Sequence, residues 1–116
     1  MNYNISKNVN LRDYGFKFDG FEYKKMICVY YQKKRNGIKI PHIFMNIIIN
    51  KEENHFGYNI VLRDGTTLYY PYYQNDYGKS SVVDLINVNI ERETRRLINY
   101  GILMPGKIQV KDDKSL

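Results

Sequence analysis

The chain has 116 residues, a formal net charge of +6 and one cysteine. A chain of this length has room for one domain, which buries about two thirds of its unfolded surface. The positive charge favours an anionic partner such as nucleic acid, although many small basic proteins bind nothing acidic. Because Cys28 is alone, an internal disulfide is excluded, and with it a disulfide-stabilised secreted scaffold.

The two ends of the chain are polar. Residues 1–10 are Asn-rich and lack the apolar segment of a signal peptide, and residues 111–116 are mostly charged. No apolar run approaches the length of about 20 residues that a membrane-spanning helix needs. We therefore expect a cytoplasmic protein without a membrane partner. Its single domain is predicted at residues 11–110, between flexible segments at residues 1–10 and 111–116.

The composition is strongly biased. Ile, Lys, Asn and Tyr together supply 51 residues, and Ala is absent. All four favoured residues have AT-rich codons, so the bias indicates a low-GC bacterium or a mobile element such as a phage or plasmid. It carries no information about chemistry.

Three turn dipeptides divide the first two thirds of the chain into predicted strands. Asp19-Gly20, Asn36-Gly37 and Asp64-Gly65 each lie between apolar or alternating runs, a pattern typical of β-hairpins with two-residue turns. A longer polar loop at residues 51–54 supplies the fourth reversal. The resulting antiparallel strands are predicted at residues 11–18, 21–34, 38–50, 55–63 and 66–74.

One helix is predicted after the strands. Ser80 or Ser81 is a suitable N-cap, and the helix is expected to end near Tyr100, with Gly101 in the left-handed position that follows many helices. A single apolar stripe runs along it, formed by Val83, Ile86, Ile90, Thr94 and Leu97. A further short strand is predicted at residues 107–110. The predicted fold class is α+β, an antiparallel β-meander of about five strands with one C-terminal helix packed on one face.

Two-residue turns would fix which residues face one another. Across Asn36-Gly37, for example, the numbers of opposed residues would sum to 73. This register divides the apolar residues between both faces of the sheet, while only one helix is present to cover a face. The face left uncovered would carry Met26, Cys28, Tyr30, Ile43, Met45, Ile47, Ile49, Tyr58, Ile60, Tyr69 and Tyr73. It is too apolar to face water, so we predict a docking surface there.

Basic and aromatic residues supply the candidate binding site. Lys33, Lys34, Arg35 and Lys39 flank the Asn36-Gly37 turn, and Arg92, Arg95 and Arg96 lie on the exposed side of the helix. Glu91 precedes Arg95 by four residues, whereas Arg92 and Arg96 are expected to lack an acidic partner on the helix. Tyr30, Tyr58, Tyr69 and Tyr73 are candidates for stacking on bases, as in single-strand binders. The alternative is that the charges are simply solvated and the tyrosines simply pack.

The sequence predicts neither an enzyme nor a cofactor. His42, His55 and Cys28 have no spacing suited to zinc, and the chain contains no glycine-rich phosphate loop or nucleophile elbow. His42 is interpreted as a hydrogen-bonded core residue and His55 as the end of a loop.

Three functional hypotheses follow. The first is a small non-enzymatic protein that binds nucleic acid, either single-stranded or through its phosphate backbone. The second is a protein-binding module or inhibitor of phage or mobile-element type, which would dock on a host or defence protein through the apolar second face of the sheet. The third is an obligate homodimer in which that face is the subunit contact.

Overall fold

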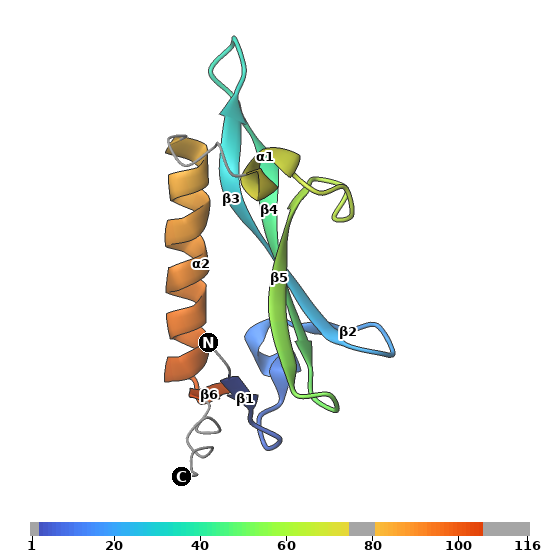
Figure 1. Ribbon diagram of the computed structural model, residues 1–116. Helices are drawn as coiled ribbons and strands as arrows, with labels where there is room; N and C mark the ends of the chain where they lie inside the picture. Colours follow the sequence, from blue (N-terminus) through green and yellow to red (C-terminus); the bar gives the residue numbers. More distant parts are fainter. Residues whose placement is uncertain (1–2, 75–80, 106–116) are drawn as a thin grey trace.

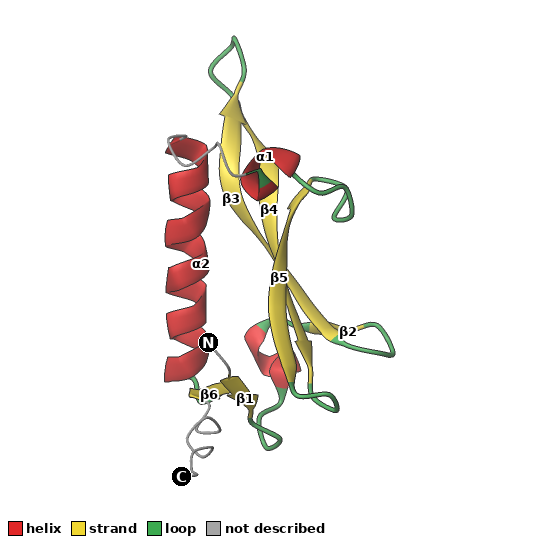
Figure 2. Ribbon diagram, in the orientation of Figure 1, coloured by secondary structure: helices red, strands yellow, loops and turns green. Residues whose placement is uncertain are grey.

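A computed structural model describes residues 3–74 and 81–105 of the chain (Figures 1 and 2). The predicted strand at residues 107–110, the predicted tail at 111–116 and most of the loop before the helix lie outside the described residues. The elements in chain order are β1 (Tyr3–Ile5), a 3₁₀ helix η1 (Leu11–Tyr14), β2 (Lys17–Phe18), β3 (Tyr23–Lys33), β4 (Lys39–Asn50), β5 (His55–Leu62), α1 (Tyr70–Tyr73), α2 (Ser81–Asn99) and β6 (Leu103–Pro105).

The predicted α+β class is confirmed. Four strands form an antiparallel sheet in the order β2-β3-β4-β5, and β1 pairs with β6 in a second, two-stranded sheet. Figure 1 shows α2 lying along one side of the long strands, with β1 and β6 below its C-terminal end. The residues that we assigned to a flexible N-terminal segment include β1, whose Ile5 is buried.

The helix begins and ends where the sequence predicts. Four residues of the predicted stripe are buried, Val83, Ile86, Ile90 and Leu97, and Thr94 is half-buried. After the last turn, Gly101 adopts a φ of +79° and donates its N–H to the carbonyl of Ile98, while Ile102 donates to the carbonyl of Leu97. This pair of hydrogen bonds is a Schellman motif, and it turns the buried Ile102 back into the core.

Two predicted strands are wrong in large part. Of residues 11–18, only β2 is a strand, because the side chain of Asn10 caps η1 and Gly15 ends it in the left-handed region. Of residues 66–74, only Leu68 bridges Val61, in the predicted register, and the chain then enters α1. Pro71 lies in the first turn of α1, where its missing N–H has no intrahelical partner to lose.

The turn between β3 and β4 has three residues rather than two. The N–H of Lys34 donates to the carbonyl of Ile38 at 2.8 Å and closes the turn. Within it, the N–H of Gly37 donates to the carbonyl of Lys34, and Gly37 adopts a φ of +87°. This is the common three-residue hairpin, a turn followed by a left-handed residue. The extra residue changes the sum of opposed residue numbers from 73 to 72 along most of the hairpin, as in the pair Tyr23 and Ile49. A register irregularity between Cys28 and Tyr31 leaves Tyr30 opposite Ile43, its predicted partner.

Outside this irregularity, the shift of one residue exchanges the two sides of β3 relative to β4, so the predicted docking face is wrong. The β4 residues expected on the uncovered face pack against α2 instead, together with Ile60 of β5. None of them is more than 2 % exposed: Ile43, Met45, Ile47, Ile49 and Ile60. They join Ile27 and Val29 of β3 in one core, so a single apolar face remains and the helix covers it.

The opposite face of the sheet is mixed in character. Its β3 and β4 positions alternate with those of the core and include Lys24, Met26, Cys28, Phe44, Asn46 and Ile48. On β5 the predicted pairing of Asn50 with His55 is confirmed, which places His55, Gly57 and Asn59 on this face. The β2–β3 pairing is shifted by two residues from the predicted one, so Phe18 lies opposite Tyr23 and faces are unchanged.

Candidate nucleic-acid interface

The predicted basic residues of the hairpin lie at its tip. Lys33 ends β3, Lys39 begins β4, and Lys34 and Arg35 belong to the turn between them; all four are exposed. Asn36 holds the turn by accepting a hydrogen bond of 3.0 Å from the N–H of Ile38. Figure 1 shows this turn extending past the N-terminal end of α2. We call Lys33, Lys34, Arg35 and Lys39 the tip cluster.

The β3–β4 hairpin accounts for the whole net charge of the protein. Residues 23–50 contain six of the 18 basic residues and none of the 12 acidic ones, so the remaining twelve basic and twelve acidic residues balance. Among the described residues, no carboxylate lies within 4 Å of a basic nitrogen of the tip cluster. Four of the six basic residues form the tip cluster, and the other two, Lys24 and Lys25, lie at the opposite end of the hairpin.

The arginines of α2 have different surroundings. Arg96 lies 3.0 Å and Arg92 3.9 Å from the carboxylate of Glu93, and Arg95 lies 3.7 Å from Glu91. Arg92 also donates to the side chain of Asn89. The expectation that Arg92 and Arg96 lack an acidic partner is therefore wrong, because Glu93 serves both. We call Arg92, Arg95 and Arg96 the helix cluster.

The two clusters are separated along the long axis of an elongated molecule. The molecule measures 60 Å along its longest axis. Figure 1 shows the tip beyond the first turn of α2, whereas the helix cluster belongs to the second half of that helix. The two predicted groups of cations are thus separate in space.

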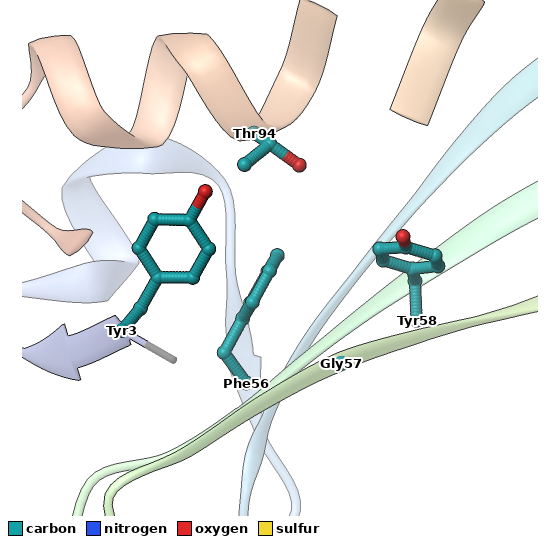
Figure 3. Close-up of a pocket in the computed structure, with 5 residues that line it drawn as sticks. All are labelled: Tyr3, Phe56, Gly57, Tyr58 and Thr94. Carbon is teal, nitrogen blue, oxygen red and sulfur yellow. The ribbon is translucent and has the colours of Figure 1, made fainter. Parts of the chain in front are cut away.

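Tyr58 is the predicted tyrosine with the best access to a cavity. It lines a pocket of about 460 Å³ with Tyr3 of β1, Phe56 and Gly57 of β5 and Thr94 of α2 (Figure 3). The ring of Phe56 lies 6.0 Å from that of Tyr3 and 5.9 Å from that of Tyr58, both in edge-to-face geometry. Burial, and then the neighbouring Tyr3, raises the pKa of Tyr58 above its ordinary value.

The other three predicted tyrosines pack against the core or hold one element to another. Tyr30 and Tyr69 pack against the core, and Tyr30 lies edge-on to the ring of His42. Tyr73 accepts a hydrogen bond of 2.9 Å from the N–H of Ile60, which connects α1 to β5, but its ring remains partly exposed. Only Tyr58 and Tyr73 therefore combine a fixed position with an accessible ring.

Sequence reasoning missed the other walls of the pocket. Tyr3 belongs to the segment that we assigned to a flexible end, and Phe56 and Thr94 were interpreted as ordinary strand and helix residues. A smaller hollow of about 290 Å³ shares Tyr3 and Thr94 with the pocket and continues to Glu91 and Arg95. We call the two hollows together the aromatic groove.

Other chemistry is limited in the part of the chain that the structure describes. In residues 3–74 and 81–105, no three His, Cys, Asp or Glu side chains are grouped so that they could hold a metal ion. The thiol of Cys28 donates to the carbonyl of Tyr30. None of the described helices is long and apolar enough to cross a membrane.

Comparison with known proteins gives no indication of the function. The chain matches no protein-family model, no curated protein and no solved structure.

Proposed function

We propose that this protein is a non-enzymatic binding protein for single-stranded nucleic acid. The tip cluster would contact phosphates, and the aromatic groove would receive bases. The observation that carries the proposal is the group of four basic residues at the tip of a hairpin that has no acidic residue between positions 23 and 50. Cations without carboxylate partners attract phosphates more strongly than cations that are already paired.

The aromatic groove supports a single strand over a duplex. Single-strand binders combine a basic surface with aromatic rings on which bases stack, at about 1–3 kcal/mol per base. In the groove, Phe56 holds the rings of Tyr3 and Tyr58 at fixed distances around a hollow of about 460 Å³. A hollow of this size lies within the range of about 300–1,000 Å³ that is usual for pockets that bind small molecules.

The experiment compares neutralisation of the two clusters. Lys33→Gln, Lys34→Gln and Arg35→Gln are combined in one variant, and Arg92→Gln and Arg96→Gln, which do not line the aromatic groove, in another. Affinity for a 20-nucleotide oligo(dT) is measured by fluorescence anisotropy over a range of salt concentrations. Each lost phosphate contact lowers the slope of log affinity against log salt by about 0.7 for a single strand, so the tip variant should lose about 2 units of slope.

At a salt concentration of about 0.1 M this change in slope corresponds to roughly 100-fold weaker binding for the tip variant. The helix variant removes two charges and should stay within about threefold of wild type, because both arginines are already paired with Glu93. Wild-type affinity in the tip variant would exclude the proposal. Equal losses in both variants would show only that binding follows net charge.

A protein partner is the second candidate, at a surface other than the one predicted. Phe18 and Phe21 are 44 % and 64 % exposed beside Tyr23, around a hollow of about 270 Å³ at the β2–β3 reversal. Aromatic residues are enriched in the anchors of protein interfaces. Light scattering tests whether that partner is a second copy of the chain: a wild-type dimer that becomes a monomer on Phe18→Ser and Phe21→Ser substitution would favour self-association through this surface, and a wild-type monomer would exclude self-association.

A further inference from the structure

A third group of basic residues surrounds a hollow at the end of the β3–β4 hairpin away from the tip. The hollow measures about 370 Å³ and lies between β2 and β3. It is lined by Gly15, Lys17, Lys24, Lys25, Met26 and Asn46. None of these residues belongs to the tip cluster or to the aromatic groove.

Two of the lysines are placed where like charges repel. Lys17 of β2 and Lys24 of β3 are directly opposed in the antiparallel pairing. Like charges in this arrangement destabilise a sheet, and opposite charges stabilise it. An anion between the two ammonium groups would attract both and offset their mutual repulsion.

The third lysine is held in place by its own stem. The Nζ atom of Lys25 lies 5.8 Å from the centre of the ring of Phe16, which is almost fully buried. Its Cε atom lies 3.3 Å from the point where a Cβ on Gly15 would stand, and Gly15 has a φ of +92°. Because the stem is already ordered, the ammonium group of Lys25 loses less entropy on binding than a free surface lysine.

The carboxylates near the hollow leave two of the three charges unpaired. Lys24 lies 3.3 Å from Asp19 and 3.9 Å from Glu22. Within residues 3–74 and 81–105, no carboxylate lies within 4 Å of the ammonium group of Lys17 or Lys25. Asn46 adds a side-chain amide, which can donate to an oxyanion.

We infer that the hollow between Lys17 and Lys25 binds a phosphate group. The ligand class is a phosphate ester or anhydride, whose oxygens accept hydrogen bonds from both ammonium groups and from the amide of Asn46. The same chemistry is offered by a free phosphorylated small molecule and by the backbone of a nucleic acid. The inference rests on the geometry of the hollow and stands independently of the proposed function.

The test uses pyrophosphate and oligo(dT) of four nucleotides as probes, followed by the backbone amide signals of the ¹⁵N-labelled protein in NMR titrations. Saturable shifts are expected at Gly15, Lys17 and Lys25. The variant combines Lys17→Gln with Lys25→Met, which keeps the apolar stem over Phe16, and should bind at least tenfold more weakly. Arg63→Gln, an exposed position in the turn after β5, is the single-charge control and should bind as the wild type does.

Thermal unfolding adds a readout that does not depend on the amide signals. In phosphate-free buffer the Lys17→Gln substitution should raise Tm, because it removes the repulsion with Lys24. Pyrophosphate should then raise the Tm of the wild type by more than that of the Lys17→Gln and Lys25→Met variant. A higher Tm of the Lys17→Gln variant in phosphate-free buffer would show that the variant protein is folded. A Tm of the double variant that does not rise with pyrophosphate would confirm the site.

The outcomes separate the two sources of phosphate and the two proposals. Tighter saturation by oligo(dT) than by pyrophosphate would assign the hollow to a nucleic-acid backbone, and the reverse order to a small molecule. Unshifted amides with both probes, or unchanged affinity in the double variant, would overturn the inference. The tip variant should keep its response to pyrophosphate, so failure of the proposed function leaves this site intact and the converse also holds.

Discussion

The tip cluster and the helix cluster contain similar numbers of basic residues but differ in what surrounds them. Arg92 and Arg96 share the buried carboxylate of Glu93, whose side chain is only 7 % exposed, and Arg95 is paired with Glu91. The hairpin has no acidic residue between positions 23 and 50. The two clusters have similar numbers of basic residues, but the positive electrostatic potential is therefore weaker at the helix cluster than at the tip cluster.

The difference follows from secondary structure. Residues three and four apart on a helix are neighbours, so a sequence with mixed charges pairs its own cations. Residues at a hairpin tip have neighbours only across the turn, and here that neighbour is another cation, since Lys33 is opposed to Lys39. The hairpin thus presents a surface whose repulsion is relieved by an outside anion.

The largest effect is expected from a substitution in the aromatic groove, which tests whether bases enter it. Tyr58→Leu keeps an apolar side chain but removes the ring, and affinity for oligo(dT) should fall by about 1–3 kcal/mol, or roughly 5- to 150-fold. Anisotropy at fixed salt measures the change. Because stacking is not ionic, the slope against log salt should stay at its wild-type value.

Tyr100→Leu is the control for Tyr58. Tyr100 is an exposed tyrosine whose ring stacks on Tyr14, outside the groove. Loss of the Tyr100 ring should leave the affinity for oligo(dT) within about twofold of wild type, because this ring does not line the aromatic groove. Equal losses in the two variants would remove the groove from the binding site and leave the tip cluster as its only part.

The next effect is a gain of binding. Glu91→Gln with Glu93→Gln removes the carboxylates that pair with the helix cluster while keeping the shape of both side chains. If pairing is what separates the two clusters, affinity for the 20-nucleotide oligo(dT) should rise about tenfold at about 0.1 M salt, with a steeper salt slope.

Glu52→Gln with Glu53→Gln provides the matched control, because these exposed residues lie in the β4–β5 turn and the same two charges are removed. The control should bind within about twofold of wild type. A gain of equal size in both variants would attribute the effect to net charge. No gain in either would show that the strand does not reach α2.

Local signals in the sequence were sufficient for the helix and for the position of each turn. The stripe from Val83 to Leu97 and the left-handed Gly101 depend only on neighbouring residues, and both are confirmed. The length of the Asn36-Gly37 turn was not predictable in this way. Glycine in the left-handed region suits both a two-residue and a three-residue turn, yet the choice decides which side of β3 faces the helix.

The candidate site was predictable only where it depends on single residues. The exposure of the tip cluster follows from a basic turn between two strands. The groove does not, because Tyr3 reaches it through the pairing of β1 with β6, whose residues are about 100 positions apart in the chain. The pairing of Glu93 with Arg96, by contrast, was readable from their spacing of three residues on the helix, although the burial of Glu93 was not.

A smaller effect is expected from one charge placed within the tip. The turns of all three predicted hairpins are held by side chains that accept backbone N–H groups: Asp19, Asn36 and Asp64. Only the turn within the tip cluster uses a neutral amide. Asn36→Asp should keep this hydrogen bond while adding a negative charge, so the salt slope should fall by about 0.7 and the affinity by about fivefold at about 0.1 M salt.

Asp64→Asn is the reciprocal exchange in the turn after β5. It removes a negative charge at a distance from the tip, and the affinity for oligo(dT) should change by less than about twofold. If Asn36→Asp also leaves the affinity unchanged, the tip does not contact phosphate, whatever the triple variant shows.

The smallest expected effect concerns acid stability and again separates the tip turn from the others. Hydrogen bonds from the side chain of Thr67, and from the N–H groups of Thr67 and Thr66, lower the pKa of Asp64 to about 2 from 3.8. A lowered pKa means that the ionised carboxylate stabilises the fold above pH 3.8 and that this contribution is lost as the pH falls toward 2. The Tm of Asp64→Asn should therefore approach that of the wild type between pH 4 and pH 2 in thermal unfolding, whereas Asn36, which does not titrate, gives its turn no such dependence. A constant difference in Tm across this range would mean that the Asp64 carboxylate does not stabilise its turn through its charge.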